Sequence, residues 1–181
     1  MALFTGKGDD GITSLFGSKE RVSKASCQTK ILGVLDETNT LIGVCKAKSR
    51  NFLYLINNSN LADILENVQQ DLFVIQAIAA GSPKSFGTDR VKRLEDIIVS
   101  IEEELPPMKT FLLSGGTELS GFLDYARAVA RRAERVFVGC SKTENTPGEV
   151  IQYLNRLSSL LYVLTRFVNH KQEVKEIPPS Y

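Results

Sequence analysis

Apolar residues recur at intervals of three and four along most of the chain, and this spacing constrains the fold more than any other feature of the sequence. It is the period of one buried helix face, whereas a half-buried strand alternates apolar and polar residues. Five stretches carry it, beginning near residues 28, 60, 88, 119 and 147. No alternating strand pattern and no repeat of fixed length accompanies them. The sequence therefore predicts an all-α fold, a bundle of five helices with no substantial sheet.

Breakers and caps place several helix ends. The second helix has to end at the Gly-Ser-Pro stretch 81–83, and the third before Pro106, because proline lacks an amide proton and restricts the residue before it. Residues suited to opening a helix precede the third and fifth runs: Thr88 or Asp89 as a cap for the third, and Thr146 as N-cap, Pro147 at the first helical position and Glu149 closing a capping box for the fifth.

A single domain is expected from the length of 181 residues, of which 43% are hydrophobic. We divide it into an N-terminal loop at 1–25, a helical bundle at about 26–170 and a flexible tail at 171–181. Lys and Arg number 22 against 21 Asp and Glu, so bulk charge favours neither nucleic acid nor a membrane surface as partner. The sequence begins without a signal-peptide pattern and holds no apolar run long enough to span a bilayer, which predicts a cytoplasmic protein.

The cysteines and the histidine argue against several kinds of site. Cys27, Cys45 and Cys140 are odd in number and lack the CxxC spacing, so we expect neither disulfides nor a zinc site. The single histidine, His170, lies near the C-terminus, which argues against a Ser-His-Asp triad or a histidine-rich metal centre. Any chemistry has to rest on Arg, Lys, Asp, Glu, Asn and the backbone.

The fourth helical stretch, with the sequence ARAVARRAER, concentrates arginine. Its guanidiniums repeat every four residues along one helix face, at Arg127, Arg131 and Arg135, with Arg132 beside them. Such a face can be solvated and relieved by the nearby carboxylates of Asp124 and Glu134. It can also bind a polyanion such as triphosphate, because arginine forks match phosphate oxygens and stay charged. This helix alone leaves both interpretations open.

The opening segment TGKGDDGITSLFG, residues 5–17, concentrates glycines and hydrogen-bond donors. Glycines let backbone amides converge on an oxyanion, and Lys7, Thr13 and Ser14 can add donors. The segment is not a Walker A loop, because the GxxxxGK[ST] order is absent and no strand precedes it. A flexible chain end has the same composition. Composition alone does not decide between an anion-binding loop and a flexible end.

Six short segments in a fixed order decide between these interpretations. They are TGKGDDGITSL, RVSK, LDETN, FLLSGG, RAVARRAER and YLNRLS, and they run from Thr5 to about Asn169. This order resembles that of the ATP:corrinoid adenosyltransferases of the propanediol-utilisation type. The combination of RRAER and YLNRLS makes the resemblance specific. That family is a five-helix bundle, which agrees with the number of helices predicted from the apolar spacing.

The resemblance implies a reaction and its partners. It implies transfer of the 5′-deoxyadenosyl group of ATP to the cobalt of cob(I)alamin, with release of triphosphate, in a homotrimer whose active sites lie between subunits. ATP with Mg²⁺ and a corrinoid are then the ligands, and a reductase and an adenosylcobalamin-dependent acceptor enzyme are further protein partners. Cobalt in the +1 state is itself the nucleophile, so no serine, cysteine or general base is needed.

The matching positions assign roles to individual residues. By this resemblance, the loop that folds over ATP contains Thr5, Gly6, Lys7, Gly8, Thr13 and Ser14. The residues that match further ATP contacts of the family are Lys24, Arg131, Arg132, Glu134, Arg135 and Asn155. Asn155 also matches the asparagine that helps to hold Mg²⁺. Arg127 matches an arginine that pairs with the equivalent of Asp36 across the subunit interface.

Phe111 matches the aromatic residue that crowds the lower face of the corrin. A ligand below the ring stabilises the oxidised metal, so a phenylalanine that displaces this ligand and excludes water makes reduction to cobalt(I) easier. With Arg131, Arg127 and Asp36, Phe111 completes the expected catalytic set. Without the resemblance, a buried loop anchor is the ordinary interpretation of such a residue.

Three positions depart from the family pattern. Ile12 stands where threonine is common, Ser114 replaces a proline, and Ser159 replaces an aspartate. A carboxylate one turn beyond Asn155 could orient an arginine or a metal-bound water, whereas serine carries no charge. One alternative function is therefore a corrinoid- and ATP-binding escort of low turnover that delivers cobalamin. A structural helical oligomer with an incidental arginine face is the other.

Overall fold

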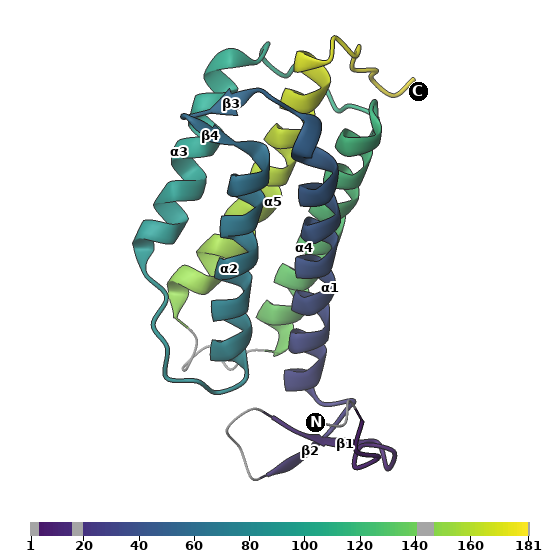
Figure 1. Ribbon diagram of the computed structural model, residues 1–181, viewed down its shortest axis with the longest axis vertical. Coiled ribbons are helices and arrows are strands. Elements are labelled where there is room, and N and C mark those ends of the chain that lie inside the picture. Colours follow the sequence, from purple (N-terminus) through teal and green to yellow (C-terminus); the bar gives the residue numbers. More distant parts are fainter. Residues whose placement is uncertain (1–3, 16–19, 141–146, 181) are drawn as a thin grey trace.

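Five long helices form the body of the protein and confirm the predicted all-α bundle. The computed structural model describes residues 4–15, 20–140 and 147–180. In chain order the helices are α1 Cys27–Lys48, α2 Leu61–Ala79, α3 Thr88–Glu104, α4 Glu118–Cys140 and α5 Gly148–Lys171. They run along the long axis of the molecule, with an N-terminal hairpin at one end and the loop between α3 and α4 at the other (Figure 1).

The core lies between the apolar stripes of these helices. α5 packs against α3 and α4, and α1 packs against α2 and α4. Leu35, Leu72 and Leu161 are among the fully buried side chains, as the helical spacing predicts. In the C-terminal half of α5 every residue from Val163 to Asn169 is buried, so this part of the helix is covered on all sides rather than on one apolar face. Of the helices in the described ranges, none is both long and apolar enough to cross a membrane.

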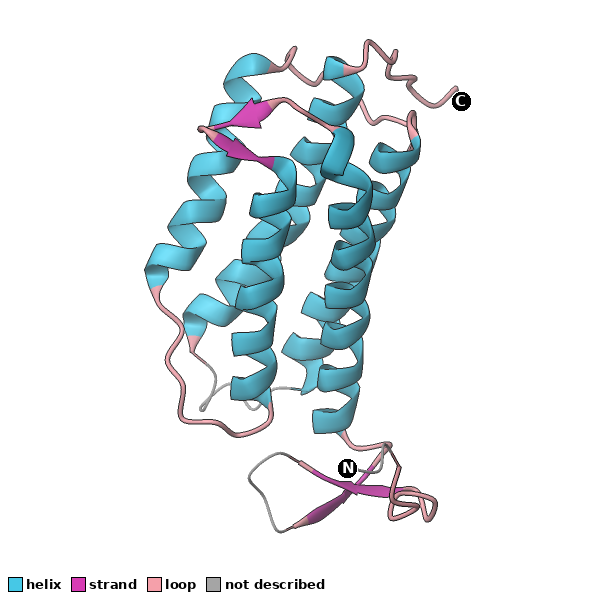
Figure 2. Cartoon of the chain, viewed as in Figure 1, coloured by secondary structure: helices cyan, strands magenta, loops and turns pink. Residues whose placement is uncertain are grey.

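Two short hairpins contain the strands found in the described residues (Figure 2). Both pairs are antiparallel, β1 Ile12–Ser14 with β2 Arg21–Ser23 and β3 Leu55–Ile56 with β4 Ser59–Asn60. Asn57 and Asn58 connect β3 to β4 with φ of 48° and 62°, the left-handed conformation that a two-residue hairpin turn requires. Strands of two or three residues are too short to show an alternating pattern, so the sequence predicted neither hairpin.

The predicted starts of α3 and α5 were wrong by one or two residues. Gly87, rather than Thr88 or Asp89, is the N-cap of α3, and no side chain caps this helix. The preceding Phe86 is buried against Tyr153, with ring centroids 5.2 Å apart, and this packing holds the chain at the helix start.

Pro147 is the N-cap of α5 instead of its first helical residue. Its φ of −57° is the value that the proline ring imposes anyway, while its ψ of 130° is extended, so the helical conformation begins only at Gly148. The Val150 amide donates to the Pro147 carbonyl at 3.0 Å, which closes the first turn. The predicted cap Thr146 lies outside the described residues.

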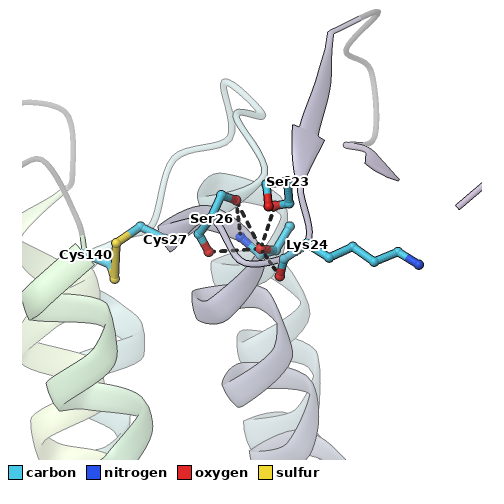
Figure 3. The surroundings of a disulfide bond; sticks show 6 residues. Ser23, Lys24, Ser26, Cys27 and Cys140 are labelled. Atoms are coloured by element: carbon cyan, nitrogen blue, oxygen red, sulfur yellow. Dashed lines mark hydrogen bonds between the residues drawn. A yellow bond between two sulfur atoms is a disulfide. The ribbon is translucent and has the colours of Figure 1, made fainter. Parts of the chain in front are cut away.

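The expectation that the chain contains no disulfide was wrong, because Cys27 and Cys140 form one (Figure 3). Cys27 is the first residue of α1 and Cys140 the last of α4, so the bond joins two helices at the end that carries the N-terminal hairpin. The two residues are 113 positions apart, and cysteine number and spacing say nothing about helix ends that packing brings together. Cys45 is buried and unpaired.

Candidate active site

The opening glycine segment folds into two turns that lie against Lys24. The Asp9 amide donates to the Gly6 carbonyl and the Gly11 amide to the Gly8 carbonyl, each at 3.2 Å. The Lys24 ammonium donates to the Gly8 carbonyl at 2.6 Å. A β-carbon on Gly8 would lie 3.0 Å from that ammonium nitrogen, so the lysine side chain packs tightly on this glycine. The structure therefore brings Lys24 onto the predicted ATP loop.

Arg21 braces this loop, a role that the sequence did not predict. Its guanidinium pairs with Asp10 at 3.1 Å and also donates to the backbone carbonyl of Lys7. The other predicted loop residues lie on the same segment and are exposed or half-buried, namely Thr5, Gly6, Lys7, Thr13 and Ser14. Arg21 is the first residue of the RVSK motif and Lys24 the last, so the motif that predicted the role of Lys24 also contains the arginine that holds the loop.

The backbone of Lys24 is fixed to the start of α1. Ser26 caps this helix by accepting a hydrogen bond from the Thr29 amide at 3.3 Å. The Thr29 hydroxyl in turn lies 2.9 Å from the Lys24 carbonyl. Figure 3 shows the Lys24 side chain extending away from this cap and from Cys27. A flexible, charged side chain thus projects from a rigid helix end.

Two arginines of α4 have no counter-charge in the described part of the chain. Arg131 and Arg135 are exposed, and neither makes an ion pair with a described residue. Arg132 pairs with Glu37 of α1. Of the two carboxylates expected to relieve this face, Asp124 does so by pairing with Arg127, whereas Glu134 accepts a hydrogen bond from another helix. The arginine face is therefore neutralised only in part by the described residues.

Glu134 and Asn155 connect the arginine face of α4 to α5. The Asn155 amide donates to Glu134 Oε1 at 2.9 Å, and its carbonyl oxygen accepts from Arg156 at 2.7 Å. Arg156 is paired with Glu95 of α3 at 2.9 Å, which orients the whole chain of contacts. Ser159, one turn beyond Asn155, is exposed. Polar oxygens and unpaired guanidiniums thus share one surface.

This surface suits a magnesium ion that arrives with phosphates. Mg²⁺ keeps several waters and binds one or two protein oxygens together with substrate phosphates. Glu134 offers carboxylate oxygens beside Asn155, whose own side-chain oxygen accepts a hydrogen bond from Arg156. Within the described ranges, no group of three or more His, Cys, Asp or Glu could hold a metal by itself. The donor set fits a metal held mainly by the nucleotide.

Phe111 lies at the opposite end of the bundle and is not a buried anchor. Its side chain is 78% exposed, on the loop between α3 and α4. The loop is held on both sides of it: Tyr162 donates to the Met108 sulfur at 2.9 Å, and the Leu113 amide donates to the Ile177 carbonyl at 2.8 Å. An apolar ring is therefore presented to the surroundings from a loop that is itself anchored.

Arg127 lies near that loop, and the structure does not bring it to Asp36. Arg127 pairs with Asp124 at 3.2 Å and lies over the Tyr162 ring at 5.8 Å from its centroid. Asp36 is exposed on α1 and has no ion pair within the described residues. The contact between Arg127 and Asp36 that the resemblance implies is thus not among the ion pairs of the described residues.

The glycine loop and the Phe111 loop are far apart in one chain. α4 has 23 residues, which corresponds to a length of about 34 Å. The N-terminal hairpin lies at one end of this helix and the loop that precedes α4 at the other (Figure 1). The arginine face extends along α4 between these two ends. A single chain thus separates the two halves of the predicted site.

Comparison with known proteins assigns the chain to a family. The sequence profile described as Cobalamin adenosyltransferase matches residues 3–168. The chain belongs to this family. The corrinoid adenosyltransferase PduO of Citrobacter freundii is 33% identical over 177 residues, covering 94% of this chain and 50% of the relative. The corrinoid adenosyltransferase of Bacillus subtilis is 31% identical, covering 98% and 91%. The chain spans about half the length of the PduO relatives it matches.

Solved structures of cobalamin adenosyltransferases have the same fold. A variant PduO-type ATP:corrinoid adenosyltransferase from Lactobacillus reuteri, complexed with cobalamin and ATP, is similar with a TM-score of 0.87 at 28% identity. The match covers 98% of this chain and 96% of that one. A second variant of that enzyme, complexed with ATP, gives a TM-score of 0.86 at 28% identity. These findings confirm the predicted resemblance.

The sequence did not predict which side chains hold the Phe111 loop of this cobalamin adenosyltransferase fold in place. Asp124 and Arg166 are buried polar side chains that hold the Phe111 loop, through the Gly115 amide and the Pro106 carbonyl respectively. Arg166 also pairs with Glu176 at 3.1 Å, so part of the predicted tail lies against α5. No sequence motif marks these contacts. Whether the tail is flexible stays a prediction.

Proposed function

We propose that the protein is an ATP:corrinoid adenosyltransferase, which transfers the 5′-deoxyadenosyl group of ATP to the cobalt of cob(I)alamin and releases triphosphate. One observation carries the proposal. Arg131 and Arg135 are exposed and lack a counter-charge among the described residues, beside the Glu134–Asn155 pair. Membership of the family supplies the reaction, and this face supplies a place for its triphosphate.

ATP binding rests on the glycine loop and on Lys24. The ammonium that donates to the Gly8 carbonyl is positioned to donate to a phosphate oxygen instead, once the loop closes over the nucleotide. Gly6 and Gly11 have φ of 66° and 78°, so the loop is built on conformations that other residues rarely adopt. Arg21 would keep the loop attached to the hairpin while it closes.

Charge develops on the leaving triphosphate, and the arginine face is suited to stabilise it. The cobalt(I) electron pair forms the bond to C5′ of the ribose while the bond from C5′ to the phosphate oxygen breaks, and that pair of electrons leaves with triphosphate. The guanidiniums of Arg131, Arg132 and Arg135 would hold its oxygens in place as charge accumulates. Mg²⁺, when bound, neutralises part of the same charge. Glu134 and Asn155 would hold this ion.

The corrinoid would lie against Phe111. The exposed ring can cover the lower face of the corrin, where it would displace the axial ligand and exclude water from the metal. Because the ring is exposed on an anchored loop, contact with a ligand costs little rearrangement of the bundle. The protein then needs no general base, which agrees with a chain whose single histidine is exposed on α5.

The active site would lie between subunits of a homotrimer. One chain holds the N-terminal hairpin and the loop between α3 and α4, which carries Phe111, at opposite ends of the bundle, so a second subunit would bring a nucleotide site and a corrin site together. Arg127 uses Nε for Asp124, which leaves its terminal amino groups for Asp36 of the partner subunit. The absence of an ion pair to Asp36 within the described chain supports this arrangement.

An anaerobic assay tests the proposal. The purified protein is mixed with Mg-ATP and chemically reduced cobalamin, and adenosylcobalamin and triphosphate are measured. Protein-dependent formation of both, in equal amounts, is the expected result. Binding of Mg-ATP and cobalamin without product would favour the low-turnover escort, for which the exposed Ser159 is the motivating position, and Ser159→Asp should then raise turnover. Binding of neither ligand would leave only a structural oligomer.

A cytoplasmic location, a reductase and an adenosylcobalamin-dependent acceptor enzyme complete the proposal. A reductase is needed because the nucleophile is cobalt(I), and an acceptor is needed because the product is a cofactor. Coupled turnover from cob(II)alamin with an added reductase would test the first of these partners.

A further inference from the structure

Asp124 is a buried carboxylate that makes two separate contacts. Its side chain is on α4, and only 6% of the residue is exposed. Oδ2 accepts a hydrogen bond from the Gly115 amide at 2.9 Å, and Oδ1 accepts one from Arg127 Nε at 3.2 Å. A buried carboxylate is costly unless each oxygen is satisfied, and here one oxygen binds a loop and the other a guanidinium.

Gly115 is clamped from two helices. Asp124 of α4 accepts a hydrogen bond from the Gly115 amide, and the side-chain amide of Asn169 on α5 donates to the Gly115 carbonyl at 3.0 Å. The next residue, Gly116, has φ of 129° and packs so closely on Asn169 that a β-carbon would collide with that side chain. Gly115 is four residues from Phe111. The clamp therefore holds the base of the loop that carries the exposed ring.

Arg127 is the cation available to Asp124. The two residues line a small cavity of about 30 Å³, whose other polar walls include Tyr162, Arg166 and Glu176. Arg166 is already paired with Glu176 at 3.1 Å and with the Pro106 carbonyl. Arg127 has no other ion-pair partner among the described residues. Its guanidinium is thus held by Asp124 through Nε, and its terminal amino groups make no ion pair or hydrogen bond to a described residue.

We infer that Asp124 is a positioning residue that couples the Phe111 loop to Arg127 in the adenosyl transfer reaction. The carboxylate of Asp124 on α4 fixes the positions of the Phe111 loop and of the Arg127 guanidinium. A displacement of the loop would therefore shift the guanidinium, and a displacement of the guanidinium would shift the loop. The inference rests on the proposed function, since it assigns Phe111 to the corrin and Arg127 to the subunit contact. Asp124 itself touches neither ligand in this account.

Two substitutions separate the contacts of Asp124. Asp124→Asn keeps an oxygen acceptor for the Gly115 amide but removes the charge that orients Arg127. Asp124→Ala removes both contacts. Asp96→Asn, on the exposed surface of α3 where Asp96 pairs with Lys92, is the control for loss of one carboxylate. Arg127→Ala, alone and combined with Asp124→Asn, completes a double-mutant cycle.

Turnover and the hydrogen exchange of the loop are measured on each variant of the 181-residue chain. Asp124→Ala should lower kcat for adenosylation by about ten- to a hundredfold with the KM for Mg-ATP within about twofold, the size expected for charged hydrogen bonds. Hydrogen exchange of the Gly115 amide should accelerate about tenfold or more in Asp124→Ala and much less in Asp124→Asn. Asp124→Asn and Arg127→Ala should be non-additive. Asp96→Asn should match the wild type.

The axial ligation of bound cob(II)alamin provides a further measurement, which would not change if Asp124 had only a structural role. Electron paramagnetic resonance of the complex with Mg-ATP reports the fraction that has lost its lower ligand, and Asp124→Ala should lower this fraction. If Asp124→Ala does not fold, Asp124→Asn carries the test through the double-mutant cycle.

The outcomes separate this inference from the proposed function. A wild-type protein that forms no adenosylcobalamin contradicts the proposed function. An active wild type whose Asp124 variants keep the kcat and the Gly115 exchange rate contradicts the positioning role. So does a variant that loses Mg-ATP affinity and turnover in equal proportion, because that result indicates a general folding defect.

Discussion

The side-chain amide of Asn155 donates a 2.9 Å hydrogen bond to Glu134, and this contact joins α5 to the arginine face of α4. It gives the exposed guanidiniums of Arg131 and Arg135 a polar neighbour without neutralising them. A triphosphate with its magnesium ion is the kind of ligand that would complete such a surface.

Removal of Arg131 should weaken nucleotide binding. Arg131→Ala is expected to raise the Kd for Mg-ATP by about ten- to a hundredfold, because a hydrogen bond to a charged group contributes about 1.5–3 kcal/mol. Isothermal titration calorimetry measures this directly. Arg50→Ala, at an exposed arginine two residues after the end of α1, is the matched control and should bind as the wild type does. Unchanged affinity in Arg131→Ala would remove the arginine face from the site.

Neutralising Asp36 should disturb the subunit contact rather than the bundle. In the proposed homotrimer, Asp36→Asn would leave Arg127 of the partner subunit without its intersubunit carboxylate, and loss of one partner of a buried pair commonly costs about 3–5 kcal/mol. The expected result is a large fall in kcat/KM for cobalamin. The unfolding temperature of the helical bundle of each subunit should not change. Sedimentation analysis checks whether the oligomer persists. Wild-type kinetics would show that Asp36 has no such partner.

Phe111→Ala should impair cobalt reduction far more than ATP binding. The ring is 78% exposed, so its removal should change the free energy of unfolding by only about 0.5 kcal/mol or less. Turnover from cob(II)alamin with a reductant should fall, while calorimetry with Mg-ATP should be unaffected. Leu53→Ala removes an equally exposed apolar side chain at another loop and serves as the control. Equal losses in both measurements would instead indicate misfolding of the loop.

Breaking the Cys27–Cys140 disulfide should destabilise the bundle. A bond between residues 113 positions apart is expected to contribute about 2–5 kcal/mol to the free energy of unfolding. Chemical denaturation of the wild type with and without a thiol reductant measures this contribution. Cys27→Ser should show the lower stability and no response to the reductant. If the reductant shifts both proteins equally, the effect does not come from this bond.

The stability of the protein should fall at alkaline pH because of Cys45. Burial raises the pKa of the Cys45 thiol from 9.0 to about 12. The folded protein thus keeps a proton that the unfolded chain loses at lower pH, and ionisation favours unfolding. The thiol's contribution is full below about pH 9 and is lost as the pH rises towards about 12.

Urea denaturation at a series of pH values checks this dependence, with Cys45→Ala as the comparison. Burial also raises the pKa of Tyr153, so the variant should retain part of the alkaline slope. Alkylation by iodoacetamide gives a second measurement, because only the thiolate reacts readily. Cys45 in the folded protein should resist the reagent at pH 8. Rapid modification under native conditions would contradict the burial.

The sequence by itself determined the number of helices, their starts to within one or two residues and the membership of the family. These properties depend on short-range physics, since helix hydrogen bonds and the apolar stripe that a helix buries both repeat within a few residues. Most of the proposed ATP-binding residues of α4 and α5 were likewise marked by the short motifs RRAER and YLNRLS, because residues at a fixed spacing along one helix lie at a fixed distance from each other.

Only the tertiary structure decided which distant residues meet. The disulfide between Cys27 and Cys140, the bond from Asn155 to Glu134 and the hold of Asp124 on Gly115 all depend on how helices are rotated and how loops return to them. Packing of whole helix faces determines these contacts, and no local pattern records it. The same packing placed the glycine loop and the loop that carries Phe111 at opposite ends of the bundle, so the proposed cooperation between them would need a second subunit.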